Sequence, residues 1–381
     1  MRDAVIVEAV RTPVGKRKGS FAETHPTVLS STILQTLVDR AGIEPELVDD
    51  VIWGCVMQVA EQSLNIARSA VLGAGWPESI PATTVDRQCG SSQQAVHFAA
   101  AGVISGQYDF AIAGGVESMT RVPMMSSMQG ADPYGPDFAA RYGGVIPDQG
   151  SGAELIAKHW NLSRTQLDEF ALESHARAAA AQDSGAFDAE IAPWTFADGT
   201  TLTADEGVRR GGTLESMAGI RLAFREDGVL TAGNSSQMSD ASAALLITTS
   251  ELAAQHGLTP LARIHTTVLA ANDPVMMLTA PIPGTKKALE RSGLTMDDIG
   301  VFEVNEAFAP VPLAWAAETG ADRAKLNPLG GAIALGHPLG ASGARIMTTM
   351  IHHMRVNDIR YGLQTMCEGG GQANVTILEL L

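Results

Sequence analysis

The sequence predicts an α/β fold made of two duplicated halves, with a segment of different texture between them. Short apolar runs rich in β-branched residues alternate with helical patterns, which is typical of a largely parallel sheet covered by helices. A helix end, a short acidic turn and a strand at residues 40–55 recur at residues 291–305, which indicates an internal repeat. The expected limits are 1–117 for the first half (completed by about 240–260), 118–239 for an inserted loop domain and 260–381 for the second half.

In the first half, the elements follow from periodicity and from turn residues. Leu29, Ile33 and Leu37 recur at four-residue spacing and predict a helix that ends at Gly42. The pattern then predicts a strand over 51–57, a helix over 65–75, an extended segment over 81–87, a helix over 91–105 and a strand over 108–114 that Gly114 and Gly115 close.

The loop domain and the second half contain three further marked elements. A helix is expected over 164–182, with Ser163 as its cap and Gln166 at the third position after it. In the second half, a helix over 341–354 follows His337, and a strand after it ends in the glycines 369–371. These two elements correspond to the helix after Cys89 and the strand before Gly114.

Composition excludes several classes of protein. The chain has 381 residues, 45% of them hydrophobic and 18% charged, which excludes a disordered protein. Its net charge of −16 argues against a nucleic-acid partner. No apolar stretch reaches the length of a membrane span and the N-terminal residues do not resemble a signal peptide, so we expect a cytoplasmic protein without a membrane partner. Gly accounts for 39 residues, above the usual share, which indicates tight turns or close backbone approaches.

Two positions suit nucleophilic chemistry. Cys89 stands where an extended run ends and a helix begins, so the helix dipole and free N–H groups would favour its thiolate. The alternative is a small buried hydrophobe. His337 lies in the Gly-rich turn Gly336–Gly343, which lacks the Lys of a phosphate loop and suits either a positioned general base or a structural His.

Two further positions complete a candidate site. Cys367 begins the run Cys-Glu-Gly-Gly-Gly, either as an acid/base beside exposed N–H groups or as a buried residue of a hairpin. Asn305 follows a strand, where a helix cap is the simpler alternative. A Cys–His pair with a second Cys and an Asn favours acyl transfer through a thioester. No metal site is expected, because the spacing is wrong for zinc, and Cys55 is assigned to the core.

At this point the sequence resembles the thiolase family of acyl-CoA acyltransferases, nearly from end to end. The matching motifs, in order, are Cys89-Gly90-Ser91, Thr231-Ala232-Gly233-Asn234-Ser235-Ser236, Pro281-Ile282-Pro283, Asn305-Glu306-Ala307-Phe308, Gly336-His337-Pro338 and Cys367-Glu368-Gly369. The resemblance implies a five-layer αβαβα fold, a homodimer or homotetramer, and thiolytic cleavage of a 3-ketoacyl-CoA or the reverse condensation. It implies CoA as a co-substrate and no tightly bound cofactor.

The resemblance also implies residue roles. Cys89 would be the acylated nucleophile, His337 its base and Cys367 the second acid/base. Asn305 would hold a water that forms one oxyanion hole with His337, and the amides of Cys89 and Gly369 would form the other. The residues implied in binding CoA or the substrate are Arg209, Ser216, Ser236, Phe308, Met277 and Ala307.

Three departures from the family pattern bear on the substrate. Glu368 replaces the usual aliphatic residue, Asp148-Gln149-Gly150 replaces His-Met-Gly, and Cys89 is followed by Gly-Ser-Ser-Gln-Gln rather than Gly-Ser-Gly. Together they resemble degradative thiolases of actinobacterial type, including those of steroid breakdown. A biosynthetic acetoacetyl-CoA thiolase is the alternative. A ketoacyl synthase, which has no second active-site Cys, a Cys hydrolase and a non-catalytic scaffold are the other classes considered.

Overall fold

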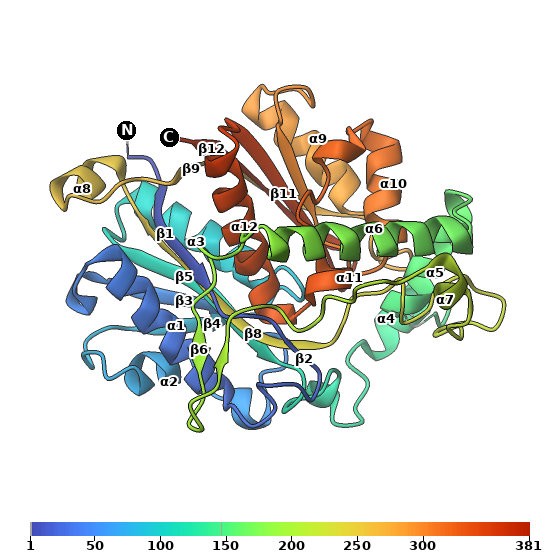
Figure 1. Cartoon of the computed structure of the whole chain (residues 1–381), viewed down its shortest axis with the longest axis horizontal. Coiled ribbons are helices and arrows are strands. Elements are labelled where there is room, and N and C mark those ends of the chain that lie inside the picture. Colours follow the sequence, from blue (N-terminus) through green and yellow to red (C-terminus); the bar gives the residue numbers. More distant parts are fainter. Residues whose placement is uncertain (1, 146) are drawn as a thin grey trace.

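The computed structural model describes residues 2–145 and 147–381. It contains a ten-stranded mixed sheet with helices on both faces and a separate two-stranded sheet. Figure 1 shows the first half in blue and cyan, the second half in orange and red, and the green helix α6 running across the second half. The predicted α/β class is confirmed.

The strands of the first half lie in the order β4-β3-β5-β8-β1. β3 pairs in parallel with β4 and β5, whereas β8 is antiparallel to both β5 and β1. The bounds of these strands are β1 (Val5–Arg11), β3 (Asp50–Gly54), β4 (Ala82–Val85), β5 (Ala111–Ser118) and β8 (Ser239–Thr248), with the short β2 (Gly15–Lys16) pairing with β8.

The second half repeats this order as β10-β11-β12-β9. β10 is parallel to β11, and β12 is antiparallel to β11 and β9. A parallel bridge from Phe302 to Leu326 stands where the first half has β4. The bounds are β9 (Ala262–Ala271), β10 (Val301–Val304), β11 (Tyr361–Glu368) and β12 (Gln372–Leu380). The duplication read from the sequence is therefore present in the topology, and the halves join where Val5 and Ile6 pair with Arg263 and Ala262.

The helices form three layers around these strands. α3 (Ser91–Ser105) and α12 (Ser342–Val356) pack against each other between the two halves (Figure 1). α1 (Pro26–Ala41) and α2 (Ile66–Gly73) cover the other face of the first half, and α9 (Pro281–Ser292), backed by α10 (Pro310–Thr319), covers that of the second. The order helix–sheet–helix–sheet–helix agrees with the expected αβαβα layering.

The inserted segment contributes mostly helices. Ser163 and Gln166 form the predicted capping box at the start of α6. The bounds are α4 (Gly135–Arg141), α5 (Gln149–His159), α6 (Arg164–Asp183), β6 (Trp194–Thr195), β7 (Thr201–Leu202) and α7 (Leu214–Ala218), and elsewhere α8 (Ser250–Gln255) and α11 (Ala332–Leu335).

Two strand predictions are wrong at their ends. Gly114 and Gly115 do not close a strand but lie inside β5. A Cβ on Gly115 would lie 2.2 Å from the carbonyl oxygen of Gly340, so this glycine permits a close approach rather than a turn. The strand expected over 51–57 ends at Gly54, and Cys55 is a buried core residue just beyond it.

Candidate active site

The amino termini of α3 and α12 meet at the centre of the molecule. The amide of Ala344 donates a hydrogen bond of 2.9 Å to Oγ of Ser92. A Cβ on Gly343 would lie 2.4 Å from the backbone nitrogen of Gln93, so the two first turns are in direct contact. Because Cys89 precedes α3 and His337 precedes α12, the duplicated fold brings both loops to one place.

Cys89 is a buried thiol, only 2% exposed. Burial, and then the nearby Glu368 carboxyl, raise its pKa to about 12. The amides of Gly90 and Ser91 donate to the carbonyls of Arg87 and Gln88 and not to the thiol. The expectation of a helix-stabilised thiolate is therefore wrong for the resting protein, and Cys89 needs a base to ionise.

His337 is buried and its ring is fixed on both sides. Nδ1 lies 2.6 Å from Oγ of Ser342, and that hydroxyl donates its own proton to the carbonyl of Pro338 at 2.9 Å. Ser342 can therefore only accept from the ring, so the proton sits on Nδ1 and Nε2 is an unprotonated acceptor. Burial and the Arg345 guanidinium lower the pKa of His337 to about 3, which holds the ring neutral.

Asn305 lies directly after β10 and contacts the unprotonated nitrogen of His337. Its Nδ2 is 3.3 Å from Nε2 of the imidazole. Its Oδ1 is buried and has no hydrogen-bond partner among the described residues, which leaves an acceptor for a small polar ligand. The alternative of a helix cap is wrong, because α10 begins only at Pro310.

The second thiol and the glycine turn complete the group. Cys367 is 1% exposed near the end of β11, and burial followed by the charge of Cys89 raises its pKa well above the usual value. The glycines after Glu368 form the turn of a β11–β12 hairpin. A Cβ on Gly369 would lie 3.0 Å from Oε1 of Gln88, which places this turn beside the loop of Cys89.

The inserted segment places one side chain against this group. Nε2 of Gln149, at the start of α5, lies 4.0 Å from Sγ of Cys89. Asp148 is exposed and caps the same helix by accepting from the amide of Ser151. Of the two residues that depart from the family pattern here, Gln149 alone faces the nucleophile.

The residues expected to bind CoA or the substrate divide into a set that is partly or fully buried and a set that is exposed. Ser236 donates its amide to the carbonyl of Ala307 at 3.0 Å, and Phe308 makes an edge-on contact of 5.6 Å with the ring of Phe224. Met277 is buried and packs beside Gly152 of α5. The other two residues, Ser216 and Arg209, are exposed, and their hydrogen bonds are to Thr213 and His175 of the loop domain.

Other features place limits on the site. No cluster of His, Cys, Asp or Glu suited to a metal ion occurs within residues 2–145 and 147–381. Across the same residues, no helix combines the length and apolarity needed to span a bilayer.

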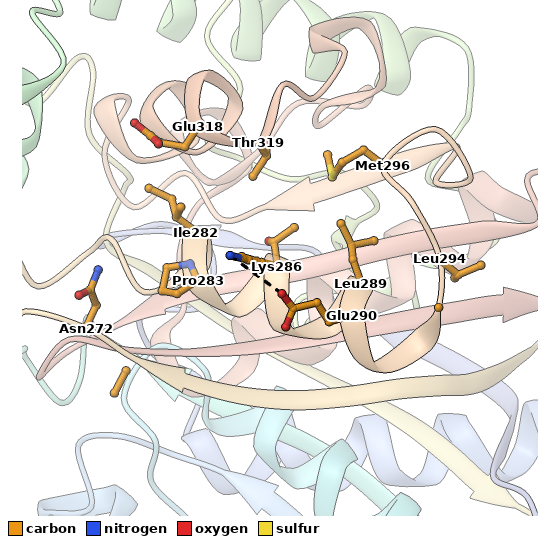
Figure 2. A pocket seen from close by; sticks show the side chains of 13 residues that line it. Asn272, Ile282, Pro283, Lys286, Leu289, Glu290, Leu294, Met296, Glu318 and Thr319 are labelled. Atoms are coloured by element: carbon orange, nitrogen blue, oxygen red, sulfur yellow. Dashed lines mark ion pairs between the residues drawn. The ribbon is translucent and has the colours of Figure 1, made fainter.

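A groove of about 800 Å³ lies on the outer side of the second half along α9, where Lys286 faces Glu290 (Figure 2). It is separate from the predicted catalytic residues.

Known proteins resemble the chain over its whole length. Residues 4–251 match the family model of the thiolase N-terminal domain, and residues 258–380 match that of the thiolase C-terminal domain. The chain belongs to the thiolase family. As a thiolase it is an acyltransferase, so the family and the reaction class read from the sequence motifs are confirmed.

Individual relatives are similarly close. The steroid 3-ketoacyl-CoA thiolase FadA6 of Mycobacterium tuberculosis is 49% identical, over 100% of this chain and 95% of that protein. The 3-ketoacyl-CoA thiolases of Erwinia tasmaniensis and Vibrio vulnificus are 44% and 43% identical over the full length of both chains. The predicted likeness to degradative thiolases of actinobacterial type is confirmed.

Ser342 is a site residue that the sequence reasoning missed. It appears in the sequence only as part of the Gly-rich turn after His337. The available signal was a hydroxyl in the first turn of the helix after a candidate base, where it can hold the imidazole.

Proposed function

We propose that this thiolase cleaves a 3-ketoacyl-CoA with CoA into acetyl-CoA and a shortened acyl-CoA, in fatty-acid or steroid degradation. The observation that supports this most directly is the neutral, buried His337 with its unprotonated Nε2, together with the two buried thiols of Cys89 and Cys367. A hydrolase needs one thiol and a water, whereas cleavage of a carbon–carbon bond also needs a proton donor for the leaving carbon.

The first half-reaction uses both cysteines. Nε2 of His337 takes the proton of Cys89 as its sulfur attacks the 3-keto carbon. The bond between C2 and C3 breaks, the acyl group stays on Cys89, and Cys367 protonates C2 to release acetyl-CoA. In the second half-reaction CoA attacks the acyl-cysteine, Cys367 takes the thiol proton of CoA, and His337 returns a proton to Cys89.

Developing negative charge is stabilised at two places. A water held by Oδ1 of Asn305, together with the protonated His337, would donate to the thioester enolate oxygen. The amides of Cys89 and Gly369 would donate to the other oxyanion. Donors of this kind are each worth about 3–4 kcal/mol in transition-state stabilisation.

CoA binds as a co-substrate, across the loop domain. Ser236 adjoins the His337 loop, since His337 donates its amide to the carbonyl of Gln237. Arg209 gives an acidic protein a local cation for the phosphates of CoA, with Ser216 beside the pantetheine, and Phe308, Met277 and Ala307 line the acyl pocket. Residues 118–239 then act as the loop domain over the site, between halves at 1–117 and 260–381, in a cytoplasmic homodimer or homotetramer.

The test is kcat/KM for thiolysis across a panel of 3-ketoacyl-CoAs, from acetoacetyl-CoA to substrates with bulky rings. We expect substrates bulkier than acetoacetyl-CoA to be preferred. An optimum at acetoacetyl-CoA would support the biosynthetic alternative, and no thiolysis of any substrate would contradict the proposed function.

A further inference from the structure

Glu368 is a fully buried carboxyl group next to the turn that holds the nucleophile. It is the last residue of β11, so strand alternation directs it to the face opposite Cys367. Its Oε1 accepts the amide of Asn374 at 2.9 Å. A Cβ on Gly90 would lie only 1.9 Å from the same oxygen, so the carboxyl group is packed against the backbone directly after Cys89.

Two buried acceptors beside Gly90 have no donor. Oε2 of Glu368 and Oδ1 of Asn374 have no hydrogen-bond partner among the described residues. Oδ1 of Asn374 would lie 2.8 Å from the same Cβ on Gly90. A carboxylate and an amide oxygen cannot satisfy each other, whereas a protonated carboxyl group can donate to the amide oxygen.

The surroundings favour the protonated form. The charged or titratable groups that face Glu368 are Asp86, Arg87 and Cys89 of the preceding turn, Cys367 of its own strand, and His97 of α3, which lies beyond Asn374. Nη1 of Arg87 donates to Gln372, while its buried Nε has no hydrogen-bond partner among the described residues. Burial raises the pKa of Glu368 to about 8 in spite of Arg87, and Asp86 adds to the rise.

An ionised Glu368 would oppose the chemistry next to it. The charge of this carboxylate raises the pKa of both Cys89 and Cys367. The proposed reaction places negative charge on both sulfurs in turn, so a carboxylate in contact with the Cys89 turn disfavours each step.

We propose that Glu368 is a positioning residue that must carry a proton, donated to Oδ1 of Asn374, for Cys89 to be acylated. This rests on the proposed function, because it assumes that Cys89 is the acylated nucleophile. Glu368 touches no substrate and acts through the backbone of Gly90 and the field at the two thiols.

The test is the single-turnover acylation of Cys89 by acetyl-CoA between pH 6 and pH 10, followed by intact-protein mass spectrometry. This half-reaction does not use the free thiol of CoA as a reactant. The ionisation of that thiol would otherwise add its own pH dependence to the measured rate. In the wild type, the rate should fall about tenfold from pH 7 to pH 9, because about one Glu368 in ten keeps its proton one unit above its pKa. In Glu368→Gln, which presents the same acceptor and a permanent donor, this fall should disappear.

The matched control is Glu303→Gln. Glu303 is a second carboxyl group whose pKa burial raises to about 8, and it lies on β10. In this variant the acylation rate should still fall from pH 7 to pH 9. If the fall is lost in Glu303→Gln and kept in Glu368→Gln, the group that titrates is Glu303 and the inference is overturned. A wild-type acylation rate that does not fall from pH 7 to pH 9 would also overturn the inference.

A second variant covers the case in which Glu368→Gln does not fold. Glu368→Met cannot ionise either, but it leaves the amide of Asn374 unpaired, so it should lose the alkaline fall and have a lower thermal midpoint. An alkaline fall that persists in either folded variant contradicts the inference. If the wild-type Cys89 accepts no acyl group at any pH, the proposed function itself fails, which is a distinct result.

Discussion

Nδ2 of Asn305 lies 3.3 Å from Nε2 of His337, on the side of the ring opposite its 2.6 Å contact with Ser342. The Ser342 hydroxyl donates to Pro338, so it fixes the imidazole tautomer by accepting from Nδ1. The two contacts together fix the orientation of the imidazole, with unprotonated Nε2 beside Asn305. In the resting site the pKa of Cys89 is about 12 and that of His337 is about 3, so the proton passes from the thiol to Nε2 only as the sulfur attacks the substrate.

Ser342→Ala should lower kcat about 10- to 100-fold, by analogy with groups that orient other catalytic imidazoles. The variant removes the acceptor of the Nδ1 proton and leaves the ring free to adopt the other tautomer. Ser342→Thr keeps the hydroxyl and is the matched control, which should recover most of the loss. Steady-state thiolysis measures both, and an unchanged kcat in Ser342→Ala would contradict the role of Ser342.

Cys367→Ser should separate the two thiols. Because Cys89 and His337 remain, the variant should still acquire an acetyl group from acetyl-CoA, slowly. It should lose the exchange of the acetyl α-protons with solvent, because the group that moves those protons is absent. NMR of acetyl-CoA in D₂O follows this exchange, and a normal rate in the variant would assign proton transfer to another group.

Gln149→Met should change the substrate preference more than any change at Asp148. The Gln149 amide lies 4.0 Å from Sγ of Cys89, whereas Asp148 is exposed. We expect Gln149→Met to shift the kcat/KM optimum toward acetoacetyl-CoA. Asp148→His should mainly remove a helix cap, worth about 1 kcal/mol of stability, and Asp148→Asn should keep it. An optimum that stays in place in Gln149→Met would exclude Gln149 as a determinant of specificity.

Because His97 is buried in its neutral form, the free energy of unfolding should decrease as the pH falls below about 6.5. Burial and Arg87 lower its pKa to about 3 in the folded state, while the unfolded chain has a value near 6.5. Between these values the unfolded state binds more protons, so the stability from a neutral His97 is complete above about pH 6.5 and declines below it, by up to about 1.4 kcal/mol per pH unit.

His97→Gln should remove this part of the slope. Urea unfolding at fixed protein concentration between pH 4.5 and pH 7 measures it in both proteins. Parallel curves for the wild type and the variant would show that His97 does not remain neutral in the folded state.

Elements that depend only on residues close together in the chain could be predicted from the sequence. The helix over 91–105 and the capping box of Ser163 and Gln166 are local, and both are present with the predicted residues. The duplicated order of the strands could also be predicted, because the two halves share an internal sequence repeat.

The rest depends on contacts between distant parts of the chain. The close approach that makes Gly115 necessary involves Gly340, and the partner of Asn305 is His337. The ionisation of Cys89 depends on burial and on Glu368, and the state of Glu368 in turn depends on Asn374 across a hairpin. A dipole argument from the start of one helix could not include these groups.

In the proposed mechanism, Cys89 carries the acyl group during turnover. The most direct measurement is peptide mass spectrometry after the protein is mixed with a 3-ketoacyl-CoA in the absence of CoA, with Cys89→Ala as the control. We expect one acyl adduct, on the peptide that contains Cys89, and none on Cys367 or in the control. An adduct on Cys367 alone would contradict it and reverse the roles of the two thiols.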